Sequence, residues 1–442
     1  MADLFTDFEK VSPETWNAKI IKDLKGVPYE SLIFTDEAGN IIKPFYTKED
    51  FSEASTSLPS NAGWDACVTI KVEDEKKSNN EALEALKLGA SGLIFQIDKK
   101  INLSILLKDI SVENIYCEFS LTNDSLALAN ELAKYEGKKN AFDNKYKTHV
   151  NIDPIYLFEK YGEWHTNKES DFEVIKERNH LSVNASLYHE AGANYIHEIS
   201  YCLAHLNEYL NYLSPSELKK LQYLHLTLNI SSAFFTEIIK ISAIRELCRF
   251  LTSQYNIDLP IHLHINTALI NKSNLDSYNN LLRSTTEAMS AIIGNADSLC
   301  ICPFNVPFET SDNFSNRMAI NQHHILKHES YLDKTTNISS GSYFIETKIK
   351  ETCEKAWNEF KEIEKKGGLI ELLKNNFIQR EIENDFSMFI ESLNKKERII
   401  IGVNQYINSN DKPLKKYIET KEVKGKEIEK LYQRIYVNHI SA

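Results

Sequence analysis

The segment Ile261-His-Leu-His-Ile-Asn-Thr-Ala268 alternates apolar and polar side chains, which is typical of a β-strand with one apolar face. Seven other segments also have strand character: Ala66–Val72, Gly92–Ile97, Ile115–Ser120, Thr148–Ile155, His180–Leu187, Leu224–Ile230 and Ser298–Phe304. Segments with a helical period lie between them, for example Asn194–Leu213, Phe234–Tyr255 and Tyr278–Gly294. Eight strands that alternate with helices predict an α/β fold of the (β/α)8 TIM-barrel type.

The inner faces of these predicted strands are unusual. Parallel barrel strands normally carry apolar side chains on both faces. Four strands here have a polar face, made of His149, Asn151 and Asp153, of Ser182, Asn184 and Ser186, of His225, Thr227 and Asn229, and of His262, His264 and Asn266. Polar groups inside a barrel must bond to one another, hold water or contact a ligand. Two interpretations stay open, a bore for a ligand and a water-filled, hydrogen-bonded interior.

The sequence on either side of the barrel predicts two appendages. Residues up to about 25 have a helical pattern, and residues 31–47 are expected to form two strands around the turn at Gly39-Asn40. This arm packs either on a partner subunit or on its own domain. Residues 347–363 predict a long helix, and the chain closes with a lysine-rich helical tail. We expect an N-terminal arm over 1–62, a barrel over 63–346, and a helical extension over 347–442.

The composition limits the partners and the compartment. The 442 residues carry a net charge of −12, which argues against nucleic acid or an anionic membrane as the main partner. No apolar run approaches the roughly 20 residues of a membrane span, and the first residues show no secretory signal. The cysteines are scattered, odd in number and mostly in apolar segments: Cys67, Cys117, Cys202, Cys248, Cys300, Cys302 and Cys353. They predict buried thiols in a reducing cytoplasm.

Three motifs carry a more specific signal. They are Glu190-Ala-Gly-Ala193, the segment Tyr278–Met289, and a longer stretch with Arg317, Asn321, Glu329, Ser330 and Gly341-Ser-Tyr-Phe-Ile-Glu346. The first part of the long stretch predicts an amphipathic helix that buries Met318, Ile325, Leu326 and Leu332. All three resemble motifs of the methylmalonyl-CoA mutase family. A weaker resemblance runs from Trp16 to Tyr406 and includes Lys43-Pro-Phe-Tyr-Thr47.

The resemblance implies a demanding chemistry. Catalytic members of the family convert (R)-methylmalonyl-CoA to succinyl-CoA by a radical route that uses adenosylcobalamin, and the pantetheine arm of coenzyme A threads through a polar bore. This chemistry needs a cobalt-ligating domain, a barrel that excludes water, and donors to the thioester carbonyl.

Three elements of the catalytic members are missing from this sequence. The cobalamin domain carries Asp-x-His-x-x-Gly, which occurs nowhere in the chain. The Tyr-His pair that precedes Glu-Ala-Gly-Ala is Ser186-Leu187 here, and leucine cannot donate a hydrogen bond to a carbonyl. The stretch that places a tyrosine beneath the cofactor corresponds to the shorter, unrelated Ser60–Ala66. Tyr188-His189 would replace the lost pair only if the loop were rebuilt.

The resemblance also assigns vestigial positions in the bore. The family's Arg-x-His-x-Gln-Thr-Ser is His262-Leu-His-Ile-Asn-Thr-Ala268 here, so an imidazole replaces the guanidinium that would meet the substrate carboxylate. The candidates for lining a vestigial substrate bore are Ser186, His262, His264, Asn266 and Thr267. No catalytic, cofactor-binding or metal-ligating residue is predicted. The His-x-His pattern suggests a metal-dependent barrel hydrolase, but the order of ligands along the chain is wrong for one.

A retained scaffold with lost catalytic elements predicts the small, non-catalytic subunit of an adenosylcobalamin-dependent methylmalonyl-CoA mutase, an isomerase of propionate metabolism. It would form a cytoplasmic heterodimer with a large catalytic subunit that holds adenosylcobalamin. Two alternatives stay open. One is an active acyl-CoA mutase barrel that uses a separate cobalamin-binding chain, and the other is a stand-alone regulatory barrel that binds acyl-CoA.

Overall fold

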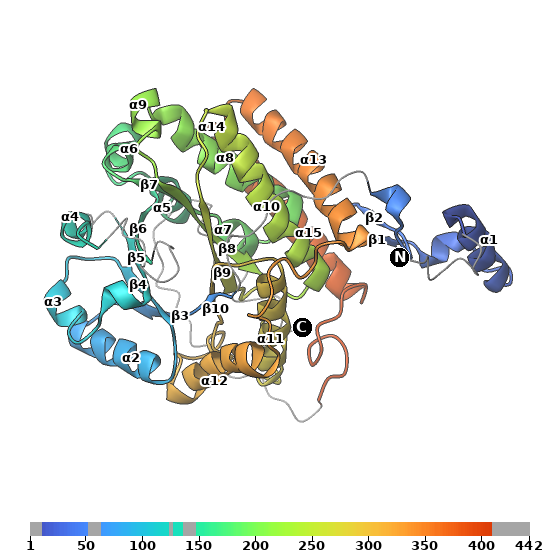
Figure 1. The fold of residues 1–442 in the computed structure, drawn as a ribbon, viewed down its shortest axis with the longest axis horizontal. Coiled ribbons are helices and arrows are strands. Elements are labelled where there is room, and N and C mark those ends of the chain that lie inside the picture. Colours follow the sequence, from blue (N-terminus) through green and yellow to red (C-terminus); the bar gives the residue numbers. More distant parts are fainter. Residues whose placement is uncertain (1–10, 52–62, 123–126, 136–146, 409–442) are drawn as a thin grey trace, which may run out of the picture.

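A computed structural model describes residues 11–51, 63–122, 127–135 and 147–408. Its centre is one sheet of eight parallel strands in the order β6-β5-β4-β3-β10-β9-β8-β7. The strands are β3 (Asp65–Lys71), β4 (Gly92–Ile97), β5 (Tyr116–Leu121), β6 (Thr148–Ile152), β7 (His180–Asn184), β8 (Tyr223–Ile230), β9 (Ile261–Thr267) and β10 (Ser298–Cys300). The sheet curls into a nearly closed barrel with helices outside it (Figure 1). The predicted TIM-barrel fold is confirmed.

The barrel has a seam between β6 and β7. These strands are the two edges of the sheet, and in the described part of the chain no ladder joins them. Side chains bridge the seam instead. Ser182 Oγ donates to Asn151 Oδ1 at 2.8 Å, and the Asn184 backbone N–H donates to Asp153 Oδ2 at 2.6 Å. The polar residues of these two strands therefore replace backbone pairing.

Three predicted strands end well before the expected residue, each for a local reason. β6 stops at Ile152 because Asp153 accepts from the Tyr156 N–H and so caps the next helix, which begins at Pro154. β7 stops at Asn184, whose side chain accepts from both the N–H and the hydroxyl of Ser186. β10 stops at Cys300, because the Cys302 N–H donates to a side chain, Thr267 Oγ1, at 2.8 Å.

Helices cover the outside of the barrel. Those before and between the strands are α2 (Glu75–Lys87), α3 (Leu103–Leu106), α4 (Ala127–Leu132), α5 (Pro154–Tyr161), α6 (Lys168–Lys176), α7 (Ser186–Glu190), α8 (Tyr195–Tyr212), α9 (Pro215–Leu218), α10 (Phe234–Gln254) and α11 (Asn279–Ile293). Those after the last strand are α12 (Asn313–His324), a π-helical turn (Ile325–Glu329), α13 (Tyr343–Lys365), α14 (Leu369–Lys374) and α15 (Phe377–Asn394). The apolar cores lie between the sheet and this layer.

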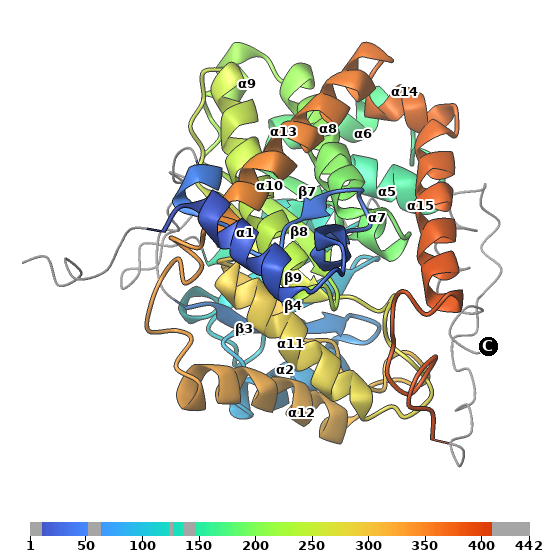
Figure 2. The same ribbon diagram turned by 90° about the vertical axis from the view of Figure 1, so that its right-hand side faces the viewer.

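The C-terminal helices form a partial second layer. α13 packs across α8 and α10, as both views show (Figures 1 and 2). Because α8 is covered on two sides, most of its residues are buried, including the polar Ser200 and Asn207. The expected burial of Ile325 is wrong, since its side chain is 45% exposed where the helix changes to the π-helical turn. Leu326 is buried as expected.

The N-terminal arm has two parts with different surroundings. Its hairpin, β1 (Phe34–Thr35) and β2 (Ile41–Ile42), packs on the chain's own domain, where Tyr195 of α8 donates to Asp36 at 2.6 Å. The helix α1 (Pro13–Asp23) projects away from the body (Figure 1) and buries none of its residues. No helix in the described ranges is both long and apolar enough to cross a membrane. The predicted lysine-rich tail falls mainly on residues 409–442, outside the described residues.

Candidate functional site

Aromatic and imidazole rings fill the interior of the barrel at the N-terminal side. His149 of β6 lies 4.7 Å from His225 of β8 and 4.6 Å from His262 of β9, measured between ring centroids. His225 and His262 also stack on each other at 5.1 Å, because they are register partners on neighbouring strands. Tyr116 of β5 stacks on His262, also at 5.1 Å. We call these four residues the ring layer.

Glycine on the adjacent strand makes room for the ring layer. Gly92 of β4 is the register partner of Tyr116. A Cβ atom at Gly92 would lie 2.5 Å from Cys67 Sγ and 3.0 Å from Tyr116 Cδ1. The tyrosine ring can therefore reach across the bore only because position 92 has no side chain.

Polar side chains of neighbouring strands hydrogen-bond to the ring layer. Tyr116 donates to Glu118 Oε2 at 2.9 Å and also contacts His225 Nε2 at 3.0 Å, while Asn151 Nδ2 lies 3.1 Å from His225 Nδ1. Burial, with the nearby imidazoles of His264 and His180, holds the pKa of His225 well below its usual value. Burial also lowers the pKa of His264. Both rings are thus uncharged at neutral pH.

A cavity of about 390 Å³ lies above the ring layer, at the C-terminal ends of the strands. Four of the five predicted bore residues line it: Ser186, His264, Asn266 and Thr267. His262 does not, because it lies in the ring layer below the cavity floor of Glu118, His264 and Cys300. Structure therefore divides the predicted bore into a filled lower part and a small upper cavity.

Two buried carboxyl groups line the cavity, Glu118 in its floor and Glu190 in its wall. Glu190 is 5% exposed, and its Oε1 accepts from Asn229 Nδ2 at 2.7 Å and from the Leu269 N–H at 2.9 Å. Burial raises its pKa, while these two donors and nearby cations act in the opposite direction. The Glu-Ala-Gly-Ala motif thus uses its glutamate to join the ends of β8 and β9.

Leu187, and not the polar pair that follows it, faces the cavity. The Tyr188 hydroxyl points outward and donates to Glu159 at 2.6 Å, and His189 Nδ1 bonds to Glu198 at 2.8 Å. Neither side chain lines the cavity. The local chain has therefore not been rebuilt to bring Tyr188-His189 to the position of the lost Tyr-His pair.

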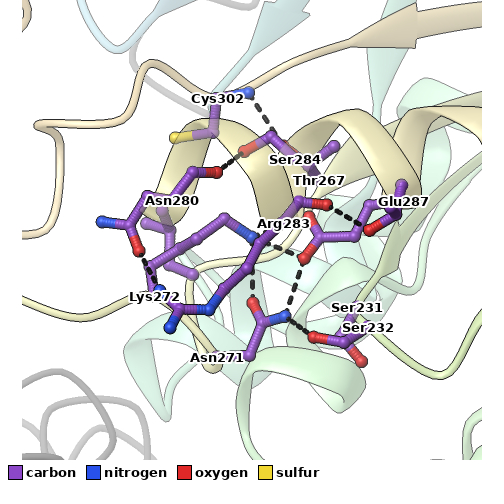
Figure 3. Close-up of polar contacts among 12 residues, drawn as sticks. Ser231, Ser232, Thr267, Asn271, Lys272, Asn280, Arg283, Ser284, Glu287 and Cys302 are labelled. Atoms are coloured by element: carbon purple, nitrogen blue, oxygen red, sulfur yellow. Dashed lines mark hydrogen bonds and ion pairs between the residues drawn. The ribbon is translucent and has the colours of Figure 1, made fainter. Parts of the chain in front are cut away.

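The motif over 278–289 ties down the loop that follows β9 (Figure 3). Glu287 of α11 pairs with Lys272 at 2.6 Å and accepts from Asn271 at 2.7 Å, and both acid and lysine are buried. About two turns away on α11, Asn280 accepts from the Ser273 N–H and from Arg283 Nη1. These residues position the loop at the cavity rim through hydrogen bonds and an ion pair with one another. Thr267 is likewise engaged, as the acceptor for the Cys302 N–H.

The cavity does not fit adenosylcobalamin. The two histidines that line the cavity are His264 and His323, and both are buried, at 1% and 2% exposure. His264 bonds to Ser298 and Asn266, and His323 accepts from Trp64 Nε1 at 3.0 Å. A cavity of about 390 Å³ is too small for a corrin ring with its side chains. The described residues after β10 form helices and loops, with no second sheet domain.

The predicted bore residues did not include the polar groups of β5. Tyr116, Glu118 and Ser120 share the inner face of this strand, and Ser120 Oγ donates to Glu118 Oε1 at 2.8 Å. Their alternation is present in Ile115–Ser120 and would have placed them beside His149, which is the register partner of Glu118. The buried partner of Glu287, Lys272, lies in a loop and has no comparable signal.

Known proteins resemble this chain along most of its length. The sequence matches the methylmalonyl-CoA mutase family over residues 77–435. It is 32% identical over 440 residues to the methylmalonyl-CoA mutase small subunit of Porphyromonas gingivalis (strain ATCC BAA-308 / W83), covering 92% of this chain and 71% of that protein. It is 24% identical over 451 residues to the small subunit of Streptomyces virginiae, covering 93% and 73%.

A relative that is named as a large subunit matches this chain over a shorter stretch than the small subunits do. The chain is 29% identical over 242 residues to the methylmalonyl-CoA mutase large subunit of Propionibacterium freudenreichii subsp. shermanii, covering 53% of this chain and 33% of that protein. It thus spans about a third of that large subunit.

Proposed function

Because the chain belongs to the methylmalonyl-CoA mutase family, we propose that it is the small, non-catalytic subunit of an adenosylcobalamin-dependent methylmalonyl-CoA mutase. In this proposal a large subunit holds the cofactor and the substrate and isomerises methylmalonyl-CoA to succinyl-CoA. The two chains form a cytoplasmic heterodimer. In this proposal the small chain has three regions: an arm over 1–62, a barrel over 63–346 and an extension over 347–442.

The observation that carries the proposal is the ring layer. A pantetheine arm needs an open path along the barrel axis, and four rings with centroid separations of 4.6 to 5.1 Å occupy that path. Clearing it would mean moving buried, hydrogen-bonded groups with no replacement partners. Leu187 at the cavity wall supplies no donor for a thioester carbonyl. Both alternatives, an active barrel and a stand-alone acyl-CoA receptor of the family's kind, require the path that the rings close.

The arm supports a role in assembly. α1 buries none of its residues, and apolar side chains of the arm are exposed: Val11 63%, Trp16 49%, Ile21 55% and Val27 52%. Apolar side chains gathered on one projecting element favour contact with a partner. The hairpin anchors this element to α8 and α13, so α1 is presented from a fixed base.

Co-expression with the large mutase chain of the same genome tests the proposal. Light scattering after size-exclusion chromatography is expected to show a stable one-to-one complex. Trp16→Ser should weaken the complex without changing the melting temperature of the isolated chain, because Trp16 is exposed there. Leu282→Ser, which removes a similarly exposed apolar side chain on α11, is the matched control. Failure of the two wild-type chains to associate would contradict the proposal.

A further inference from the structure

Three imidazoles of the ring layer lie close enough to share one ion. His149, His225 and His262 each offer a ring nitrogen, and the three nitrogens lie within 4.8 Å of one another. Any three points this close have a common point at most about 2.8 Å from each. Zinc–imidazole bonds are about 2.0–2.1 Å long. Each ring therefore needs to move inward by less than about 1 Å to coordinate a metal.

Neighbouring side chains contact the three imidazoles in the way that side chains around a metal site contact its histidine ligands. One nitrogen of each ring has a neighbour outside the trio: His225 Nδ1 has Asn151 at 3.1 Å, His149 Nδ1 has Tyr223 at 3.2 Å, and His262 Nε2 has Ser298 at 2.9 Å. Metal-ligating histidines almost always bond through the second nitrogen in this way. We assign the opposite nitrogens, Nε2 of His149 and His225 and Nδ1 of His262, as the ligating atoms. The metal would then replace the contact of His225 Nε2 with the Tyr116 hydroxyl. For His225, the Asn151 amide must turn so that its oxygen accepts the Nδ1 proton. Its NH2 group then faces Ser182 Oγ, and the hydroxyl becomes the acceptor of the bond that bridges the seam.

Charge and ligand type select the ion. Glu118 is 3% exposed, and its Oε2 lies 3.5 Å from His225 Nε2, so a carboxylate lies beside the three rings. One negative charge and three nitrogen donors favour a dication over an anion. Imidazole nitrogen suits Zn²⁺, Co²⁺, Ni²⁺ and Cu²⁺, whereas Mg²⁺ and Ca²⁺ prefer oxygen.

We propose that His149, His225 and His262 form a binding site for a transition-metal dication such as Zn²⁺. The ligands come from β6, β8 and β9, and β6 is one edge of the unpaired seam. A shared ion would link this edge to β8, across β7, where no ladder joins β6 to β7. The ion enters from the N-terminal side of the barrel, since His262 is partly exposed while the other two rings are buried. The ion would have a structural role, and the proposed metal site does not depend on the mutase proposal.

The test uses the untagged full chain after removal of metal with a chelator. Titration with Co²⁺ is expected to give visible absorption bands that saturate at about one equivalent, and Zn²⁺ should displace them and raise the melting temperature. His262→Gln, which changes the most exposed ligand, should weaken binding about 100-fold. His264→Gln removes a buried bore imidazole outside the trio and is expected to keep full binding. Circular dichroism checks that each variant folds, and His149→Gln is the second ligand variant if His262→Gln does not.

Two results would overturn the site. One is a wild-type chain that takes up no stoichiometric Co²⁺ or Zn²⁺. The other is equal binding by wild type, His262→Gln and His149→Gln, which would place the metal elsewhere, for example at the exposed His328.

Discussion

The rings of Tyr116 and His262 lie face to face inside the barrel, with centroids 5.1 Å apart and planes inclined by 11°. One ring comes from β5 and the other from β9, so the contact crosses the bore. The family's scaffold is thus retained around an axis that no longer offers a path for a long ligand.

Closure of the bore predicts that the isolated chain does not bind acyl-CoA. Calorimetric titration with methylmalonyl-CoA or succinyl-CoA is expected to show no saturable heat up to about 1 mM ligand, a range that would detect even weak affinity. The large mutase chain, titrated in the same way, is the positive control. Saturable binding that Ser186→Leu abolishes would mean that the upper cavity still accepts the acyl group.

Room for Tyr116 depends on glycine at position 92. Gly92→Ala is expected to cost about 1–3 kcal/mol of unfolding free energy, because the new methyl group would lie 2.5 Å from Cys67 Sγ. Adding Cys67→Ala removes that sulfur and should recover part of the loss in a double-mutant cycle. Denaturant unfolding measures both values. Full additivity of the two changes would contradict the proposed clash.

The buried lysine of α10 predicts a large loss of stability. Lys240 is 0% exposed and lies 2.8 Å from Glu198 and 2.7 Å from Glu237. Although burial opposes its charge, the two carboxylates raise the pKa of Lys240 to about 12. Lys240→Met should cost about 3–5 kcal/mol, because it leaves buried carboxylates without their partner.

The matched control for Lys240 is Lys176→Met on α6. Lys176 pairs with Glu173 at 2.6 Å, but the pair lies at the surface, so its loss should change stability little. Both variants are compared by denaturant unfolding at pH 7. Similar effects of the two substitutions would contradict the importance assigned to burial.

A buried histidine predicts a defined pH dependence. Burial, with the charges of His324 and Lys327, lowers the pKa of His323 to about 3, from 6.5 when exposed. Below pH 6.5 the unfolded chain binds a proton at residue 323 and the folded chain does not. The contribution of neutral His323 to the free energy of unfolding is therefore full above pH 6.5 and is lost as the pH falls below it. Between pH 7.5 and 5.5, wild type should lose about 1.4 kcal/mol more than His323→Gln.

His323→Gln keeps an acceptor for the Trp64 N–H, so the comparison isolates the titration. His328→Gln, an exposed change just beyond the same helix, should follow the wild-type pH profile. Parallel pH profiles for wild type and His323→Gln would show that residue 323 does not titrate as proposed.

The sequence alone was sufficient to predict the barrel fold but not the contacts among the side chains inside the barrel. Alternation in segments such as Ile261–Ala268 shows directly which face of a strand is polar, and the barrel follows from eight strands that alternate with helices. Whether a polar bore is open depends on contacts between strands far apart in the chain. His149, His225 and His262 meet only because the barrel closes, and Tyr116 joins them only because residue 92, opposite it, is glycine. No pattern within one strand encodes that meeting.

Local hydrogen bonds explain the other differences. The alternation of His180–Leu187 continues past Asn184, yet the strand ends there because the Asn184 side chain accepts from the N–H and the hydroxyl of Ser186 at the start of α7. The same end of β7 places Leu187 at the cavity and turns Tyr188 outward. The motif predicted that these residues lie near the cavity. The hydrogen bonds at the end of β7 determine which of their side chains faces it.

Turnover measured with matched chains tests the central claim most directly. The assay follows formation of succinyl-CoA from methylmalonyl-CoA with adenosylcobalamin, for this chain alone, with a small cobalamin-binding protein, and with the large mutase chain. We predict no product in the first two cases and turnover in the third. That turnover should persist when Leu187 is replaced by methionine in this chain, because the reaction takes place in the large subunit. Product formed by this chain with only the cobalamin-binding protein would contradict the account.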